Sequence, residues 1–588
     1  MQTDRRDLDG AVKPRHDPEH DAVCASAAPH VLVVAPPGTG KTYLAVRLAA
    51  SIAPSLAGSE KVLLLTFSNQ ARTQLEHEAA RQLCPGLRRR VRVANYHAFF
   101  WRAVWAHRRA LGLPLDAQIG SRRRRLDALR CCDEIAVREL KGQEGLLDSL
   151  AELRFDRFHD DRTPDAEILK PLLDVVDCEL RAGRLVFEDL GALFWKLLET
   201  YPVVAKAYAD RYPVVIADEH QDASELQDAL VRRFGRARRV ILADPMQLIY
   251  GFRGSNPERL DRHAEECDER HELRTPHRWH GDVDTGRWLL AVRARLQGEE
   301  DESPAPAALQ VIKTNRAHGL NAMKPHVRTA AARAFADGLA TVAVLAAWNS
   351  EVADLRGYLS RQNMFPRQLG GGSDFDEARE DIECLPRLGD AHAVARHAIE
   401  RVRSLVQTLR PDVVKQVQKR LGSDGVKLSG RCGDEARDIL GALVPLYKRG
   451  AAAYVTCVVS ALEACAARGH HLPRVEAVGA LRSTADACKV NDLDLEGVLT
   501  RYADGIVAAA HAAPRIDRGL FVMTAHQSKG KEFDAVILAN VGGRQFPDDD
   551  ESRRLFYVSI TRGSKRWVVI APNPGASNLL GSLGFVDS

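Results

Sequence analysis

The chain has 588 residues, of which 45% are hydrophobic and 28% charged, so it has the composition of an ordinary globular protein and is too long for one core. Its formal net charge of +4 is too small to establish a nucleic-acid partner, and any such site must come from local basic patches. It has no run of roughly eighteen apolar residues, so we expect no membrane-spanning helix.

The first strong pattern is the apolar run Val31–Val34, followed by a Gly/Pro-rich loop and helical spacing of apolar residues from Leu44. This order predicts a strand, a phosphate-binding loop and a helix. The loop comprises Ala35, Pro36, Pro37, Gly38, Thr39, Gly40, Lys41 and Thr42, with Ala35 where the first glycine usually stands. A glycine-rich turn with a chance lysine is the alternative interpretation.

In a phosphate-binding loop, the backbone N–H groups around Gly38 and Gly40 would converge on phosphate oxygens at a helix N-terminus. Lys41 would reach the β- and γ-phosphates, and the Thr42 hydroxyl would ligate Mg²⁺. The sequence therefore predicts a protein that binds a nucleoside triphosphate.

Apolar runs at residues 62–67 and 91–94, with a helical stretch at 70–83 between them, continue the pattern. Strands alternating with helices at this spacing predict a parallel α/β sheet. Residues 101–201 contain many charges among helically spaced leucines and no strand run, so we expect a helical insertion there.

The sheet resumes at residues 214–217, directly before the acidic pair Asp218 and Glu219. After a strand in a phosphate-loop ATPase, Asp218 would hold Mg²⁺ and Glu219 would orient and deprotonate the attacking water. Capping of the following helix is the alternative role for such a pair.

A strand at 240–243 ends this block, and a second α/β block contains strands at 342–345, 520–523, 535–538 and 567–570. Residues 375–510 again have a helical pattern, so each half is predicted to be a sheet domain with one helical insertion. The predicted parts are a mobile tail at 1–17, a first core at 18–100 and 202–270, its insertion at 101–201, a second core at 271–374 and 511–572, its insertion at 375–510, and a C-terminal tail at 573–588.

The eleven cysteines include no C-x-x-C pair, so the sequence offers no zinc or iron–sulfur spacing. Scattered thiols fit a reducing cytosol. The first residues also lack the apolar segment of a secretory signal. We therefore expect a cytoplasmic protein.

The order of these motifs resembles the UvrD/Rep/PcrA family of superfamily 1 DNA helicases, which implies two RecA-like parallel-sheet P-loop core domains. Besides the loop and the acidic pair, six blocks carry the resemblance: T-F-S-N-Q-A at 66–71 (family T-F-T-N-K-A), N-Y-H at 95–97 (T-F-H), Q-L-I-Y-G-F-R-G at 247–254 (Q-S-I-Y-G-W-R-G), P-H-R-W at 276–279 (N-Y-R-S), T-A-H-Q-S-K-G-K-E-F at 524–533 (T-x-H-x-x-K-G-L-E-F) and E-S-R-R-L-F-Y-V-S-I-T-R at 551–562 (E-E-R-R-L-x-Y-V-x-x-T-R).

The resemblance also assigns roles at the nucleotide. Gln247 would sense the γ-phosphate, and Arg278 and Arg562 would act as arginine fingers beside Lys41 and Glu219. His277 replaces the tyrosine expected to stack on the base, and Glu532 would contact the ribose. The adenine-reading glutamine of the family falls at or near Glu19, which leaves selectivity for ATP open because a carboxylate cannot donate a hydrogen bond as an amide does.

For single-stranded DNA, the resemblance implies a face on which aromatic rings stack on bases without regard to sequence. Core packing is the alternative role of each ring, and we expect Tyr96 and Tyr250 to be the most structural. The candidate residues are Phe67, Asn69, His97, Tyr250, Phe252, Arg253 and His526.

The implied function is an ATP- and Mg²⁺-dependent single-stranded DNA translocase and helicase, 3′-to-5′ by resemblance, which acts on single strands and duplex junctions in repair, replication or recombination. One alternative is a DNA-stimulated ATPase subunit of a repair or phage-defence complex with a separate nuclease. A nucleotide switch without a nucleic-acid partner is another.

Overall fold

The computed structural model describes residues 17–120, 125–126, 128–129, 146–147, 150–151, 166–249, 257–279, 281–315, 319–364, 366–367, 382, 385–388, 391–406, 409–422, 425–426, 433–444, 446, 450–470, 475–490, 493–495, 497–499, 501–502 and 518–584. It divides into two compact units, each described below by itself. The first unit contains the described residues up to Pro306, Asp549–Thr561 and the segment from Gly581; the second contains Ala307–Asp548 and Arg562–Leu580.

The first unit is built on a six-stranded parallel sheet with the order β3-β2-β6-β7-β1-β8. Its strands are β1 (His30–Val34), β2 (Val62–Thr66), β3 (Val91–Asn95), β6 (Val214–Ala217), β7 (Arg238–Ala243) and β8 (Glu269–Glu272). The first five confirm the predicted strands. The edge strand β8, which pairs with β1, was not predicted because its mostly exposed residues form no apolar run.

Side chains of these strands alternate between two buried cores, one on each face of the sheet. Val31 and Val33 lie in the core that includes Leu44 and Leu75, whereas Leu32 and Val34 lie in the other. The hydrophobic core that contains Leu44 and Leu75 is covered by α2 (Lys41–Ile52) and α3 (Asn69–Gln82). The shorter elements α1 (Pro18–Ala25), η1 (Ala53–Ser55) and α4 (Pro85–Arg90) each add a residue to the same core.

The second face is covered by the predicted helical insertion. Phe99, Phe100 and Phe194 are buried there against the strands. The described elements on this side extend beyond the predicted bounds of 101–201; they are α5 (Tyr96–Ala106), β4 (Gln118–Ile119), α9 (Ala166–Arg181), β5 (Arg184–Leu185), α10 (Asp189–Thr200) and α11 (Pro202–Arg211). The short parallel pair β4–β5 corrects the expectation that this stretch holds no strands.

The first unit is completed by short elements after the strands and by longer helices. They are η2 (His220–Asp222), α12 (Glu225–Arg233), η3 (Pro245–Gln247), α13 (Pro257–Glu266), η5 (His277–Trp279), α14 (Val283–Leu296) and α24 (Asp550–Ile560). Because α24 packs on α14 and η3, it belongs to this unit although it lies far later in the chain.

This arrangement divides the chain differently from the predicted cores. The predicted boundary between residues 270 and 271 falls inside β8, and the spans 271–306 and 549–561 belong to the first unit. The indole of Trp288 in α14 donates to the carbonyl of Leu583 at 2.8 Å, which ties the end of the described chain to the same unit.

The second unit contains a five-stranded parallel sheet with the order β13-β10-β14-β15-β9. Its strands are β9 (Leu309–Asn315), β10 (Thr341–Ala346), β13 (Gly519–Thr524), β14 (Phe533–Leu538) and β15 (Gly563–Asn573). The helices α15 (Gly319–Ala336) and α16 (Asn349–Arg361) pack against one face of this sheet. The short helices η9 (His526–Ser528) and η10 (Asn578–Leu583) follow β13 and β15 in the chain. The four predicted strands are confirmed, and the edge strand β9 was missed. Two parallel sheets confirm the predicted α/β class.

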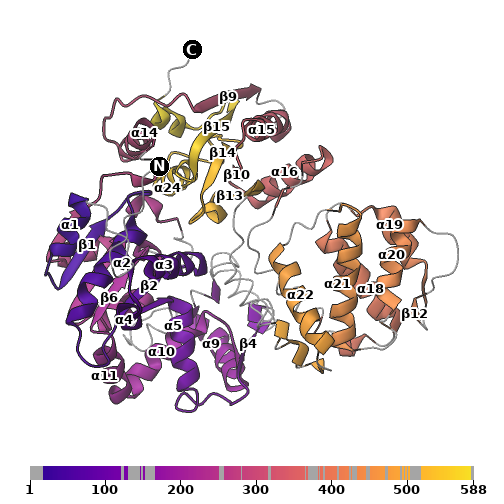
Figure 1. Ribbon diagram of the computed structural model, residues 1–588, viewed down its shortest axis with the longest axis horizontal. Helices are drawn as coiled ribbons and strands as arrows, with labels where there is room; N and C mark the ends of the chain where they lie inside the picture. The colour runs from indigo at the N-terminus through magenta and orange to yellow at the C-terminus, as the bar shows by residue number, and fades with distance from the viewer. Residues whose placement is uncertain are drawn as a thin grey trace. The chain divides into compact units, whose positions relative to one another are not determined.

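The second insertion is helical where it is described and has a core of its own. Figure 1 shows α21 between α22 and the helices α18 and α20. Because α21 is apolar on nearly all sides, its position at the centre of this group follows from its sequence. The elements are η7 (Leu385–Arg387), α18 (Ala391–Leu405), α19 (Pro411–Gln418), β11 (Leu421–Gly422), β12 (Gly425–Val426), α20 (Asp434–Leu443), α21 (Ala451–Ala467) and α22 (Val475–Val490). No described helix of either unit is long and apolar enough to cross a membrane.

A buried ion pair fixes the start of α10. Arg125 donates to both carboxylate oxygens of Asp189, at 3.3 and 3.1 Å, and the two side chains are 2% and 6% exposed. Asp189 also accepts from the backbone N–H of Val186 at 2.9 Å, while Arg125 donates to the carbonyl of Arg184 at 2.7 Å. The pair therefore holds the turn before α10 against the rest of the insertion.

We predict that Asp189→Ala destabilises the first unit by about 3–5 kcal/mol, because it leaves the Arg125 guanidinium buried without a counter-charge. Thermal unfolding and hydrogen exchange of α10 measure the effect. The control is Glu199→Ala in the same helix, which removes a partly exposed pair with Arg233 and should cost less than about 1 kcal/mol. Equal losses in the two variants would contradict the prediction.

Candidate functional site

The segment from Ala35 to Gly40 joins β1 to α2 at the carboxyl edge of the first sheet. Gly38 and Gly40 adopt left-handed backbone conformations with φ of 79° and 85°, which side chains with a Cβ rarely adopt. Space is restricted as well, since a Cβ on Gly40 would lie 2.9 Å from a ring carbon of His20. The two glycines of the predicted phosphate loop are therefore required by conformation and by packing.

Lys41 begins α2 and is only 8% exposed. Its Nζ lies 3.0 Å from Oε1 of Glu219, which follows β6. Burial lowers the pKa of Lys41, but the carboxylates of Glu219, Asp244 and Asp218 outweigh burial and hold that pKa above its usual value. Lys41 is thus a buried ammonium group at the point where the loop becomes the helix.

The neighbouring carboxyl of Asp218 is 2% exposed. Burial and the adjacent charge of Glu219 raise the pKa of Asp218 to about 7, although Lys41 opposes the shift. The carboxyl groups of Asp218 and Glu219 both interact with the single ammonium of Lys41, so a bound cation would stabilise the ionised form of Asp218. Together with the Thr42 hydroxyl, Asp218 supplies the hard oxygen donors that Mg²⁺ prefers, so the residues present fit this ion.

Glu219 is held by a chain of hydrogen bonds that leads away from the loop. Gln221 donates to Oε2 of Glu219 at 2.5 Å and accepts from the backbone N–H of Asp244 at 3.1 Å. Asp244 is fully buried, accepts from the amide of Gln247 at 2.8 Å and forms an ion pair with Arg293. The predicted γ-phosphate sensor Gln247 is therefore linked to Glu219 through Asp244 and Gln221.

Sequence reasoning missed Arg293 in α14. Burial lowers the pKa of its guanidinium, but Asp244 and Tyr557 outweigh burial and raise it. Arg293 thus neutralises a carboxylate that would otherwise be buried alone. No local pattern marks this role, because the arginine stands in an ordinary amphipathic helix 49 residues after its partner.

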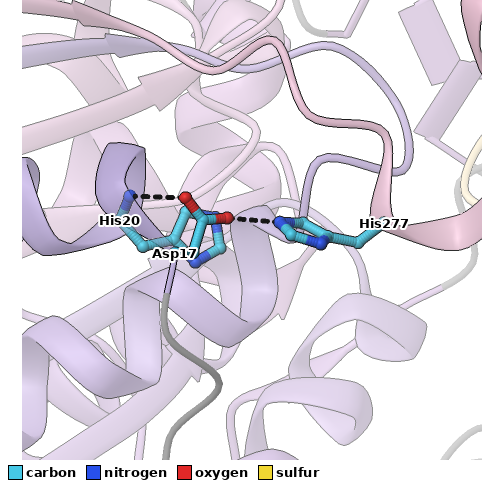
Figure 2. A group of neighbouring side chains, drawn as sticks. All are labelled: Asp17, His20 and His277. Atoms are coloured by element: carbon cyan, nitrogen blue, oxygen red, sulfur yellow. Dashed lines mark hydrogen bonds and ion pairs between the residues drawn. The ribbon is translucent and has the colours of Figure 1, made fainter. Parts of the chain in front are cut away.

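The helix α1 packs on α2, and a second group of polar side chains lies at its start: His20 of α1, its N-cap Asp17, and His277 of η5 (Figure 2). Asp17 caps α1 by accepting from the backbone N–H groups of Glu19 and His20 at 2.8 and 3.2 Å, and its other oxygen pairs with Nε2 of His277. His20 is 2% exposed, and its Nε2 bonds the carbonyl of Thr39 at 2.9 Å. Asp17 and His20 thereby fix both the loop and the predicted base-stacking residue His277.

The position expected for the adenine-reading residue, at or near Glu19, lies in α1. Glu19 is half-buried, and its carboxylate accepts from the backbone N–H groups of Arg274 and Thr275 at 2.9 and 3.2 Å. It braces the segment that precedes His277. His20, one residue later, is the side chain of α1 that lies against the loop.

Arg278 is attached to the loop through its backbone N–H, which donates to the carbonyl of Gly38 at 3.0 Å. Its guanidinium donates to the carbonyl of Thr561 at 3.2 Å and lies 5.1 Å from the ring centre of Trp279. Trp279 itself packs on the loop, since a Cβ on Gly38 would lie 2.5 Å from its ring. The predicted arginine finger is therefore placed beside the loop by segments of the first unit.

Some predicted strand-binding residues lie together near the end of β2 and the start of α5. Phe67 and His97 are partly exposed and line a pocket that also includes Glu188 and Asp222. The ring of His97 meets that of Phe187 edge to face, with centroids 6.0 Å apart. Phe187 is 54% exposed, and sequence reasoning missed it because it lies in a stretch that the helical pattern assigned to an insertion. Tyr96, in contrast, is 1% exposed and structural, as expected.

The remaining predicted residues lie outside the described residues or in the second unit. Tyr250, Phe252, Arg253 and the side chain of Asn69 lie outside the described residues. The second unit carries the other three: His526 begins η9 and is half-buried, Glu532 lies directly before β14, and Arg562 is 4% exposed with its guanidinium donating to the carbonyl of Lys531 at 3.4 Å.

Residues 16–268 match the profile of the UvrD/REP helicase N-terminal domain, and residues 519–570 match that of the UvrD-like helicase C-terminal domain. The chain belongs to the UvrD/Rep helicase family. Its parallel sheets are the two RecA-like cores of this family.

Three relatives illustrate how far the similarity extends. DNA helicase II of Haemophilus influenzae is 27% identical over 267 residues, which cover 42% of this chain and 36% of the relative. ATP-dependent DNA helicase PcrA of Leuconostoc citreum is 20% identical over 622 residues, covering 93% and 80%. An ATP-dependent helicase/nuclease subunit of Streptococcus thermophilus is 33% identical over 128 residues, covering 21% and 10%. The chain thus spans about a third of the first of these relatives.

We predict that Glu219→Gln lowers nucleotide hydrolysis at least about 100-fold, because an amide cannot take the proton of the attacking water. It should retain nucleotide binding, since Lys41 and the loop are unchanged, whereas Lys41→Ala should lose both binding and hydrolysis. Steady-state hydrolysis and equilibrium binding of a fluorescent nucleotide measure the two effects. Glu225→Gln, which alters an exposed carboxylate in α12, is the control and should leave both unchanged. Normal turnover of Glu219→Gln would exclude its role as the base.

Proposed function

We propose that the protein is an ATP-dependent single-stranded DNA translocase and DNA helicase. The observation that carries the proposal is the ion pair between the buried Lys41 and the partly exposed Glu219 beside the buried Asp218, at a phosphate loop in a chain of the UvrD/Rep helicase family. Opposite charges held at a loop rich in backbone N–H groups are the arrangement that phosphoryl transfer to water requires.

In this proposal the loop from Ala35 to Thr42 binds the triphosphate, and Lys41 compensates its charge. Thr42 and Asp218 would hold Mg²⁺, which supplies positive charge between the phosphates. Glu219 accepts the proton of the attacking water, and Gln221 keeps its carboxylate in place. We further propose that Gln247 senses the γ-phosphate, that Arg278 and Arg562 stabilise the transition-state charge, and that His277 and Glu532 contact the base and the ribose.

We propose that Phe67, His97 and Phe187 form a stacking surface for a single strand, completed by Asn69, Tyr250, Phe252, Arg253 and His526. The exposure of Phe187 beside His97 supports this surface, because an apolar ring is otherwise more stable inside the protein. Stacking of this kind tolerates any base, which suits movement along a strand.

We predict that Phe187→Ala weakens binding of a single-stranded oligonucleotide by about 1–3 kcal/mol, the value of one base–aromatic stack. Fluorescence anisotropy with labelled oligo-dT measures the affinity. Leu115→Ala removes an apolar side chain of the same insertion that is 55% exposed, and it should not change the affinity. Equal affinities of Phe187→Ala and the unmodified protein would remove Phe187 from the surface.

Family membership also supports the finer parts of the proposal, namely 3′-to-5′ polarity, action at duplex junctions in the cytoplasm, and a role in repair, replication or recombination. A second candidate is a DNA-stimulated ATPase subunit that works with a separate nuclease. The similarity to the streptococcal helicase/nuclease protein favours this candidate.

The test is the rate of ATP hydrolysis with and without single-stranded DNA, run beside unwinding of duplexes with 3′ or 5′ tails. We expect DNA to stimulate hydrolysis and a 3′ tail to be required for unwinding. Stimulated hydrolysis without unwinding, together with co-purification of a nuclease, would favour the second candidate. Hydrolysis that DNA does not change would overturn both and leave a nucleotide switch.

A further inference from the structure

A chain of hydrogen bonds between buried side chains lies directly behind the catalytic segment of the first unit. The Tyr96 hydroxyl bonds Nδ1 of His220 at 2.9 Å, and Nε2 of His220 bonds Oδ1 of Asp228 at 3.0 Å. His263 bonds the same oxygen at 2.7 Å, and its Nδ1 lies 3.1 Å from Nε2 of His30. None of the five side chains is more than 4% exposed.

The direction of these bonds follows from the charge of Asp228. Burial raises the pKa of this carboxyl, but the bonds from His220 and His263 outweigh burial and hold the pKa far below its usual value. An ionised carboxylate only accepts hydrogen bonds, so Nε2 of each imidazole donates to it. The Tyr96 hydroxyl bonds the other ring nitrogen of His220, Nδ1. Burial raises the pKa of Tyr96, so the hydroxyl keeps its proton.

His220, Asp228 and His263 are also residue types that bind metal ions. However, Arg232 donates to the second oxygen of Asp228 at 2.8 Å and already supplies the counter-charge that the carboxylate requires. Both imidazoles also lie at hydrogen-bond distance from a single oxygen. The geometry therefore favours a rigid hydrogen-bonded network over a metal site.

The two ends of the Tyr96–His220 bond adjoin residues of the proposed function. His220 directly follows Glu219, whose backbone has the left-handed values φ 55° and ψ 37°. A residue with a side chain keeps such a conformation only where its surroundings impose it. Tyr96 directly precedes His97, which lies on the exposed surface beside Phe187. One hydrogen bond thus connects the segment of the catalytic carboxylate to the segment of the stacking surface.

We propose that the Tyr96–His220 hydrogen bond is a positioning contact that couples strand binding at His97 to the geometry of Glu219. Asp228 and His263 hold His220 from the other side, so a shift of the Tyr96 segment is passed to the backbone of Glu219 rather than absorbed by the imidazole. The inference rests on the proposed function and names residues that act through Glu219 without touching nucleotide or strand. The hydroxyl that makes the contact is present because tyrosine stands where the related motif T-F-H has phenylalanine.

The test is Tyr96→Phe, which removes the hydroxyl and leaves the buried ring. We expect the ratio of DNA-stimulated to DNA-free kcat to fall about fivefold, the effect of one hydrogen bond. The KM for ATP and the Kd for oligo-dT should stay within about twofold, because neither binding site loses a contact. A purely structural defect would not separate kcat from KM in this way. All rates are measured well below the melting temperature of each variant.

Tyr208→Phe is the matched control, since it removes a hydroxyl from the neighbouring aromatic cluster of Phe99 and Phe194 without touching His220. It should keep the ratio of the unmodified protein. His220→Phe removes both bonds of the imidazole and should lower the ratio at least as far as Tyr96→Phe does.

An unchanged ratio in Tyr96→Phe, or equal losses of the DNA-free and the stimulated rate, would overturn the coupling. If hydrolysis by the unmodified protein did not respond to DNA, that result would overturn the proposed function itself. The two failures are therefore distinguishable in the same assay.

Discussion

The first unit depends on holding three ionisable groups together at one edge of a sheet, where Lys41 and Asp218 are buried and Glu219 is partly exposed. A buried charge that stood alone would favour solvent by several kcal/mol, so Lys41 and Asp218 require mutual compensation and close support. The left-handed glycines allow the loop to bring Lys41 to the end of β6, and the left-handed backbone of Glu219 turns its carboxylate back toward that ammonium. The raised pKa of Asp218 means that its carboxylate lacks a full counter-charge, which a bound cation would supply.

The same electrostatic requirement explains why distant parts of the chain belong to the first unit. Asp244 supports Glu219 through Gln221, and as a fully buried carboxylate it requires a cation of its own. Arg293 of α14 provides it and lies 5.8 Å from the ring centre of Tyr557 in α24. The charge on Asp244 thus places α14 and α24 in the first unit, although the order of motifs assigned both to the second core. A boundary drawn from motif order could not anticipate a contact made by one arginine.

Much of this architecture could be predicted because central strands of parallel sheets are buried on both faces and leave continuous apolar runs such as Val31–Val34. The edge strands β8 and β9 are partly exposed, leave no such run and were missed. In the site, Lys41, Asp218 and Glu219 could be predicted because local spacing defines their chemistry. Arg293, Phe187 and His220 could not, since their roles depend on partners far away in the chain or on exposure, neither of which a local pattern encodes.

The carboxylates of Asp17 and Asp228 each lie among two histidines, but the two groups differ in their exposure to solvent. Asp17 pairs with His277, which is 30% exposed, so this contact lies at a surface where a ligand can compete for the imidazole. Asp228 is enclosed with His220 and His263, which are 1% and 0% exposed, and it accepts a further bond from the partly exposed Arg232. A contact of the first kind can rearrange at little cost when a nucleotide arrives. A contact of the second kind resists rearrangement, because a broken bond would leave a buried donor unsatisfied. Resistance to local rearrangement is what allows one segment to move another, so the enclosed network is the better element for transmitting a displacement to Glu219.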